Sequence, residues 1–157
     1  MLNAAIFGLG NWGQTLVRSV HEKSDKIKIS RMVTRDPSKY SDFVDNTGIP
    51  ISNDYAEVLK RDDIEAVIIA TGHSVHGKHV EQAAAAGKHV FCEKPFTLTK
   101  ESALSAIDAC NKAGVKLSIA FNRRFNPALA KIRNMIETGE LGTVLHVEGA
   151  HSGHAGY

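Results

Sequence analysis

The chain has 157 residues, about one domain's worth of sequence, and its 43% hydrophobic residues are enough for a core. Its net charge of +2 gives no reason to expect nucleic acid or an anionic membrane as a partner. No apolar run approaches the roughly 20 residues that a membrane-spanning helix needs, and the N-terminus lacks the basic region of a secretory signal. Cys92 and Cys110 form no disulfide framework, so we expect a cytoplasmic protein with reduced thiols.

Short apolar runs alternate with helical patterns over the first 121 residues. The run EAVIIA is continuously apolar, as parallel strands are when both of their faces are buried. Asp36 is expected to cap a helix that Pro37 begins, and Gly87 and Gly114 are expected to end helices in the left-handed conformation. The alternation predicts an α/β fold, a doubly wound parallel sheet with right-handed crossovers. The expected strands are 2–7, 26–34, 49–51, 65–70, 88–92 and 115–121, and the other expected helices are 11–23, 55–60, 74–87 and 99–113.

The pattern changes after residue 122. Asn126 is expected to cap a helix with Pro127 at its first position. Residues 143–151 then alternate apolar and polar side chains, which predicts a half-exposed strand of the antiparallel type. No partner strand follows before the sequence ends. We therefore expect the doubly wound domain to cover 1–122 and the incomplete start of a second α/β domain to cover 123–157.

The segment GLGNWG follows the first strand and opens the first helix. The first glycine allows a tight turn, the second lets the backbone approach a pyrophosphate, and the third lets helix and strand pack closely. The helix N-terminus then offers N–H groups and a partial positive charge to the phosphates. In this context the segment predicts a dinucleotide site. Its candidate cofactor-binding residues are Gly8, Leu9, Gly10, Asn11, Trp12 and Gly13.

The end of the second strand indicates which dinucleotide binds. An acidic residue is expected about 20 positions past the glycines, to hold the adenosine ribose 2′-hydroxyl. Thr34 stands at that place, 21 residues past Gly13, and Arg35 follows it. A hydroxyl and a guanidinium suit a 2′-phosphate, which favours NADP over NAD. The alternative is that Arg35 is a solvated loop residue and that NAD is also accepted.

The segment FCEKPFTLT ends an apolar strand with a carboxylate and an ammonium side by side, at Glu93 and Lys94. These charges are either solvated or placed at the mouth of a site. Since the carboxyl ends of strands in such a sheet face the ligand crevice, the second interpretation is favoured.

The segments AIFGLGNWG, AVIIATGHSVH, AAAAGKHVFCEKPFTLT and NRRFNPALAKIRNMIETGELGTV together resemble the Gfo/Idh/MocA oxidoreductase family, in that order and spacing. The resemblance implies an NAD(P)-dependent enzyme that oxidises or reduces sugars, inositols or related compounds. It also implies a full-length protein about twice as long, whose second domain carries the substrate-site wall and often the oligomer interface.

Carried over to this sequence, the family's E-K-P motif makes Lys94 the catalytic lysine beside the nicotinamide and the substrate oxygen. The same motif implies that Glu93 orients Lys94 or the nicotinamide ribose. Pro95 can carry a cis bond. The family's A-T-P-x-x-x-H stretch implies that His76 lies close to the cofactor. The resemblance also makes Thr71, Gly72 and Asn122 cofactor-binding candidates, with Gly72 at a position where proline is usual, and places Arg124 along the crevice.

No residue of the chain is assigned as the general acid/base. The resemblance places that histidine after Tyr157, whereas His146, His151 and His154 come before the expected position. A zinc site is not expected, because His73, His76 and His79 at three-residue spacing do not converge and no other ligand joins them. Cys92 is interpreted as a buried apolar residue.

These observations predict an NADP-dependent oxidoreductase, with NAD possible as cofactor and a sugar, polyol or related small molecule as substrate. The chain would be its cofactor-binding half, inactive alone, in a homo-oligomer formed through the second domain. The alternative is a non-catalytic NADP-sensing or regulatory protein with the same fold.

Overall fold

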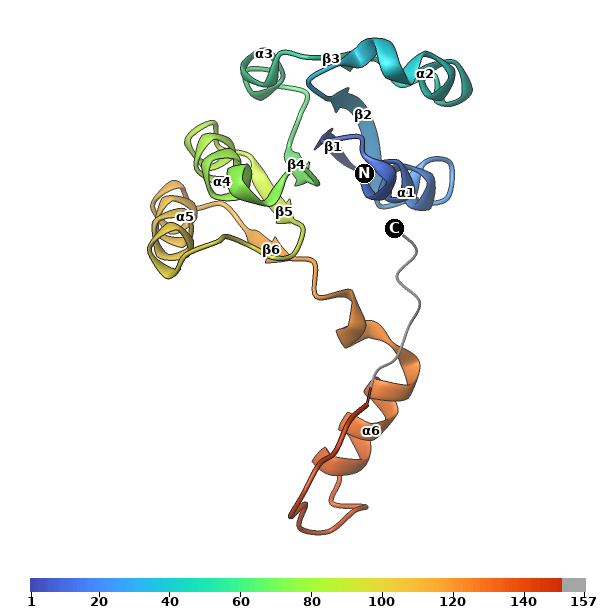
Figure 1. Cartoon of the computed structure of the whole chain (residues 1–157), viewed down its shortest axis with the longest axis vertical. Coiled ribbons are helices and arrows are strands. Elements are labelled where there is room, and N and C mark those ends of the chain that lie inside the picture. Colours follow the sequence, from blue (N-terminus) through green and yellow to red (C-terminus); the bar gives the residue numbers. More distant parts are fainter. Residues whose placement is uncertain (151–157) are drawn as a thin grey trace. The chain divides into compact units, whose positions relative to one another are not determined.

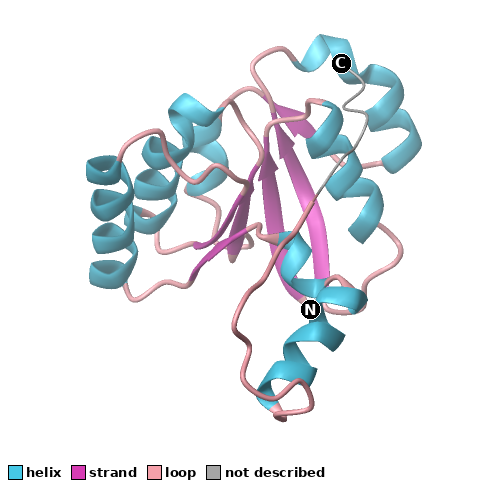
Figure 2. Cartoon of the chain, turned by 60° about the horizontal axis from the view of Figure 1, so that its bottom comes forward, coloured by secondary structure: helices cyan, strands magenta, loops and turns pink. Residues whose placement is uncertain are grey.

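The computed structural model describes residues 1–150. The chain divides into two compact units, residues 1–120 and a second unit that begins at Phe121. In the first unit, helices cover both faces of a central sheet (Figure 1, Figure 2). This arrangement confirms the predicted doubly wound α/β fold.

The sheet has six parallel strands in the order β3-β2-β1-β4-β5-β6. From β1, the chain first adds β2 and β3 on one side and then adds β4, β5 and β6 on the other side, as in two successive βαβ halves. The strands are β1 (Leu2–Phe7), β2 (Ile27–Val33), β3 (Ile51–Ser52), β4 (Ala66–Ile69), β5 (His89–Cys92) and β6 (Leu117–Ile119). The helices of this unit are α1 (Asn11–Val20), η1 (Pro37–Tyr40), α2 (Ser41–Thr47), α3 (Tyr55–Leu59), η2 (His73–Val75), α4 (His76–Ala85) and α5 (Lys100–Ala113).

Two apolar cores lie on the two faces of the sheet. One core packs Val17 of α1 and Phe43 of α2 against one face. The other packs residues of α3, α4 and α5, including Val80 and Ala106, against the opposite face. Side chains of β1 and β4 enter both cores, which explains why these strands read as continuous apolar runs.

The first strand and first helix are joined by a turn in which two of the three glycines leave no room for a side chain. Gly8 has a φ of 97°, which favours glycine, and a Cβ there would overlap the backbone of Ala70. A Cβ at Gly13 would overlap the carbonyl oxygen of Gly8. Gly10, between them, has open space where its Cβ would stand. Two of the three glycines are therefore required by packing, and the third is not.

The helix ends agree with the predicted signals in part. Gly87 and Gly114 have φ values of 70° and 67°, which confirms the left-handed conformation expected for both. Asp36 does precede a helix that begins at Pro37, but its side chain caps no backbone N–H. Its carboxylate instead accepts a hydrogen bond of 2.6 Å from Ser38 Oγ and lies 3.3 Å from Lys39 Nζ.

The second unit contains η3 (Asn122–Phe125) and α6 (Pro127–Glu137), described here without reference to the position of the first unit. Asn126 caps α6 as predicted, accepting from the N–H of Ala128 at 3.0 Å. The strand predicted over 143–151 is wrong for residues 143–150, which form no strand, and residue 151 lies outside the described residues. A strand needs hydrogen-bond partners for its backbone, and residues 121–150 offer none.

We expect Gly13→Ala to lower the free energy of unfolding by about 1–3 kcal/mol, because the added methyl meets a backbone oxygen that cannot move aside. Gly10→Ala is the matched control; it meets no atom, and as a weaker N-cap residue it should lower the free energy of unfolding by only about 0.5–1 kcal/mol. Urea unfolding of the three chains followed by circular dichroism measures both values. Equal stability of the two variants would contradict the packing requirement.

Candidate dinucleotide and active site

The register of the sheet brings the predicted site residues to one edge. Phe7 pairs with Val33 and with Ile69, and Ile69 pairs with Cys92, so β1, β2, β4 and β5 end at the same level. The residue that follows each strand therefore lies on the carboxyl edge of the sheet. These residues are Gly8, Thr34, Ala70 and Glu93, and all but Ala70 were predicted from sequence.

The turn after β1 leaves the first amides of α1 accessible. Gly10 occupies the N-cap position with no side-chain cap, and the first turn of α1 contains no acidic residue. The amides and the partial positive charge of the helix therefore have no competing carboxylate from within the helix. Together with the open space at Gly10, this arrangement fits a pyrophosphate.

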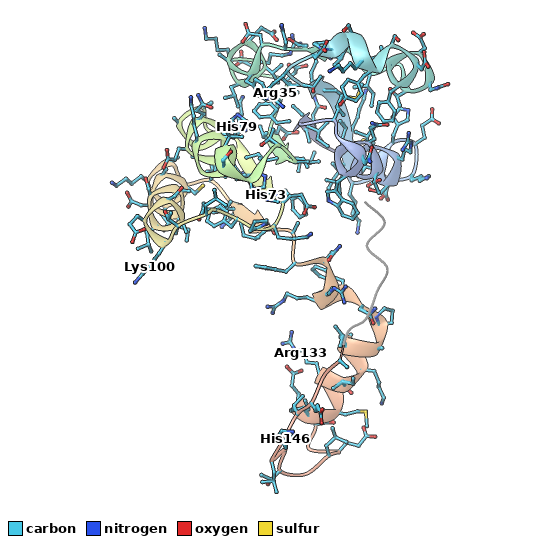
Figure 3. The ribbon with its side chains drawn as sticks, in the orientation of Figure 1. Arg35, His73, His79, Lys100, Arg133 and His146 are labelled. Atoms are coloured by element: carbon cyan, nitrogen blue, oxygen red, sulfur yellow. The ribbon has the colours of Figure 1, made fainter. Side chains whose placement is uncertain are left out.

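A cleft of about 600 Å³ opens on the same edge. That volume lies within the range of about 300–1,000 Å³ that small-molecule sites occupy. Figure 3 labels Arg35 in the loop after β2 and His79 in α4, which both line the cleft, and His73 in the short helix η2, which does not. The residues lining the cleft are Gly8, Leu9, Gly10, Thr34, Arg35, Tyr40, Tyr55, Ala70, Thr71, Gly72, Ser74, Val75 and His79. Tyr40, Tyr55 and His79 were not predicted, because they enter from helices that only the strand order brings together.

No carboxylate lines the cleft at the end where Thr34 and Arg35 lie, among the residues that the structure describes. The carboxylate of Asp36 is engaged by Ser38 and Lys39 instead. Those two contacts lower the pKa of Asp36, so its carboxylate remains ionised and is paired with residues of η1. The cleft thus offers a hydroxyl and a guanidinium to a ligand, and no acidic group.

The wall of the cleft at α4 is aromatic. The rings of Tyr55 and His79 stack with centroids 4.9 Å apart, and Phe7 meets Tyr55 edge-on. His79 Nδ1 lies 3.1 Å from the hydroxyl of Thr71. Burial lowers the pKa of His79, and the neighbouring His76 and Lys78 lower it further. A neutral, stacked histidine gives the wall a flat surface of the kind on which a base can stack.

Glu93 connects the E-K-P segment to the glycine turn. Its buried carboxylate accepts a hydrogen bond of 2.5 Å from the indole Nε1 of Trp12 and one of 3.2 Å from the backbone N–H of Lys94. The Lys94–Pro95 peptide bond is cis. The Lys94 side chain is exposed, and its ammonium has no hydrogen bond or ion pair with residues 1–150. The ammonium is therefore available to a ligand at the edge.

Of the other predicted residues, His76 lies apart from the cleft. The His76 side chain is fully buried and is not among the lining residues. Asn122 and Arg124 belong to the second unit, in the short helix η3, so their relation to the cleft stays a prediction.

The described residues offer little support for other kinds of site. Between residues 1 and 150, no group of three or more His, Cys, Asp or Glu side chains could hold a metal ion. The same part of the chain contains no helix with both the length and the apolarity that crossing a membrane would require. Cys92 is buried, and burial followed by the nearby Glu93 charge raises its pKa to about 12. Such a thiol carries almost no nucleophilic thiolate.

We expect neither thiol of the folded chain to react with a disulfide reagent at mildly alkaline pH, because burial raises the pKa of Cys110 as well. Both should react at once in concentrated guanidinium chloride, which serves as the control. The measurement is the release of thionitrobenzoate over minutes. Rapid reaction of Cys92 in the folded chain would contradict its assignment as an inert core residue.

A model of the family described as "Oxidoreductase family, NAD-binding Rossmann fold" matches residues 2–121. Among curated proteins, the uncharacterized oxidoreductase YrbE of Bacillus subtilis is 35% identical over 139 residues, which are 88% of this chain and 40% of that protein. The chain thus spans about 40% of the length of this relative.

Two solved structures show the same fold over 90% of the chain. A putative NADPH-dependent oxidoreductase from Desulfitobacterium hafniense has a TM-score of 0.84 and 30% identity, and the match covers 90% of this chain and 40% of that one. Scyllo-inositol dehydrogenase from Lactobacillus casei, with bound NAD(H) and scyllo-inositol, has a TM-score of 0.84 and 25% identity, covering 90% and 42%.

Proposed function

The chain belongs to the Gfo/Idh/MocA oxidoreductase family, and we propose that it forms the cofactor-binding half of an NADP-dependent dehydrogenase or reductase. One observation carries the proposal. The register places the glycine turn, the Thr34–Arg35 pair and the E-K-P segment on one edge of the sheet, although they are far apart in sequence. A dinucleotide needs these three elements in one row, for its pyrophosphate, its adenosine ribose and its nicotinamide.

The preference for NADP rests on the lining of the cleft. A 2′-phosphate would meet Thr34 and Arg35 and no carboxylate, whereas a 2′-hydroxyl would lack the acidic acceptor that NAD-binding folds provide. The planar guanidinium can pair with phosphate oxygens, and its flat face can pack on adenine. Solved relatives are described with either cofactor, so the choice depends on the residues of this chain.

Lys94 is proposed as the residue that acts on the substrate. When bound, the dinucleotide supplies or accepts the hydride at a carbinol or carbonyl carbon. The ammonium of Lys94 donates a hydrogen bond to the oxygen on that carbon and stabilises the negative charge that develops on it. Glu93 holds the backbone of Lys94 and the Trp12 indole, and so fixes the point from which the lysine side chain extends.

The proposed substrate is a sugar or polyol, a class that includes the inositol bound in the related dehydrogenase. The family resemblance assigns proton transfer to a histidine beyond Tyr157 and assembly to the second domain. We therefore expect turnover from the complete encoded protein and dinucleotide binding from the 157-residue chain.

We expect Arg35→Ala to weaken NADPH binding about 10- to 100-fold, because one charge-assisted contact contributes roughly 1.5–3 kcal/mol. NADH binding should change little, and Arg35→Lys should fall between because it keeps the charge but loses the planar fork. Isothermal titration calorimetry of the 157-residue chains gives all the dissociation constants. Wild-type affinity for NADH equal to or above that for NADPH would remove the proposed preference.

We expect Lys94→Met to lower kcat for a polyol substrate about 10²- to 10³-fold, the usual cost of losing one donor to a developing oxyanion. Affinity for NADPH should remain near wild type. Lys100→Met, which changes another exposed lysine six residues along, is the control and should retain activity. The assay follows NADPH absorbance in the complete encoded protein over a panel of polyols and sugars. No turnover of any of them by the wild type, with NADPH still bound, would favour the non-catalytic NADP-binding alternative.

A further inference from the structure

His76, at the start of α4, is one of the fully buried side chains of the fold, with 0% of its surface exposed. Both of its ring nitrogens face backbone carbonyl oxygens. Nδ1 lies 2.9 Å from the oxygen of Pro95, and Nε2 lies 3.0 Å from the oxygen of Thr71. Because a carbonyl oxygen only accepts, each contact that is a hydrogen bond needs a proton on the ring nitrogen.

The two carbonyls belong to segments that matter to the site. Thr71 follows β4 and lines the cleft, and Pro95 follows β5 directly after Lys94. Proline has no N–H, so the carbonyl is the one backbone group through which Pro95 can be held by a hydrogen bond. The ring of His76 thus joins the ends of two neighbouring strands at the base of the catalytic lysine.

Lys94 is consequently held on both sides of its Cα. Its own N–H donates to Glu93 Oε2 at 3.2 Å, and the next residue in the chain is bound through its carbonyl by His76. The Lys94 side chain beyond these two anchors is exposed and unpaired within residues 1–150. Its direction therefore depends on the backbone to which it is attached, and this backbone depends on Glu93 and His76.

The two neighbouring histidines, His73 in η2 and His79 in α4, are placed differently. His79, three residues on, lines the cleft and contacts the side-chain hydroxyl of Thr71 rather than its carbonyl. His73 is exposed and meets His76 only through an edge-to-face ring contact with centroids 5.5 Å apart. In the hydrogen bonds of the described chain, His76 alone of the three reaches the E-K-P segment.

We infer that His76 is a positioning residue, whose Nδ1–H donates to the Pro95 carbonyl and so fixes Lys94 in register with the end of β4. It acts through the backbone and touches neither cofactor nor substrate. This inference rests on the proposed function only in assigning catalysis to Lys94. It differs from the role expected from sequence, in which His76 would contact the cofactor directly.

Two variants of His76, to asparagine and to glutamine, each keep one of the two hydrogen bonds of the ring and remove the other. The amide nitrogen of asparagine stands at the δ position and can replace Nδ1, whereas that of glutamine stands at the ε position and can replace Nε2. His76→Asn should therefore keep the bond to Pro95, and His76→Gln should keep the bond to Thr71. We expect His76→Asn to retain kcat within a few fold. His76→Gln should lower kcat about 100-fold, the cost typical of a misplaced catalytic group, with the Kd for NADPH unchanged.

The kinetic experiment uses the complete encoded protein, with His73→Gln as a control on the exposed neighbour that should retain wild-type kcat. A purely structural role would lower stability and activity together in both His76 variants. Wild-type kcat in His76→Gln, or equal loss in both variants, would overturn the inference.

A readout independent of activity uses nitrogen-15 NMR of the imidazoles in the 157-residue chain. A proton on Nδ1 of His76 is expected, alone or together with one on Nε2, and a proton on Nε2 alone would overturn the inference. The backbone amide of Lys94 should shift in His76→Gln and stay in place in His76→Asn, and the reverse pattern would also overturn it. If the wild type turns over no substrate, the proposed function fails while these spectra still decide whether His76 holds the Lys94 backbone.

Discussion

The contact on which the rest of the structure depends is the close approach of Gly13 to the carbonyl of Gly8. No side-chain atom fits between them, so α1 can lie directly against the end of β1. This approach aims the first amides of the helix at the carboxyl edge of the sheet. The second close approach, between Gly8 and the backbone of Ala70, fixes the turn against the end of β4. Two glycines thus set both the packing of the fold and the position of the proposed dinucleotide site.

The side chains of Trp12 and Glu93 connect the glycine turn to the E-K-P segment by a hydrogen bond. Strand β4 lies between β1 and β5, so the glycine turn and the E-K-P segment are two strands apart. The indole of Trp12 spans this separation and donates to the buried carboxylate of Glu93. A buried carboxylate is stable only when its oxygens are satisfied, and Trp12 and the Lys94 amide serve both of them. The predicted catalytic segment is therefore held from the same turn that is proposed to bind the pyrophosphate.

Much of this could be predicted from sequence because it depends on local or periodic signals. Buried parallel strands are apolar on both faces, so EAVIIA indicated β4 without knowledge of its neighbours. The ends of such strands share one edge, so Glu93 and Thr34 could be assigned to a candidate site.

The wrong predictions concern residues whose structure depends on hydrogen-bond partners that the sequence pattern does not identify. Residues 143–150 alternate correctly but find no strand to pair with, and the carboxylate of Asp36 prefers the nearby Ser38 hydroxyl to the helix amides.

The contacts of single side chains were harder to predict than the position of their segment in the fold. The family resemblance placed His76 close to the cofactor. In the structure its ring turns inward to two carbonyls, and only the three-dimensional path of the E-K-P loop brings Pro95 within reach. Tyr55 and His79 come from different helices and stack only because the strand order places α3 beside α4 at the cleft. The separation of such residues along the sequence does not indicate that they will be in contact.

The bond between Trp12 and Glu93 has an optical consequence. Trp12 is the only tryptophan in the sequence, and 46% of its surface is open to solvent. Ultraviolet emission excited at the red edge of protein absorbance therefore originates from one indole, beside the glycine turn and bonded to the carboxylate that precedes the lysine. The folded chain contains a native fluorophore at its proposed reaction centre, and its spectrum reports on that place without interference from a second indole.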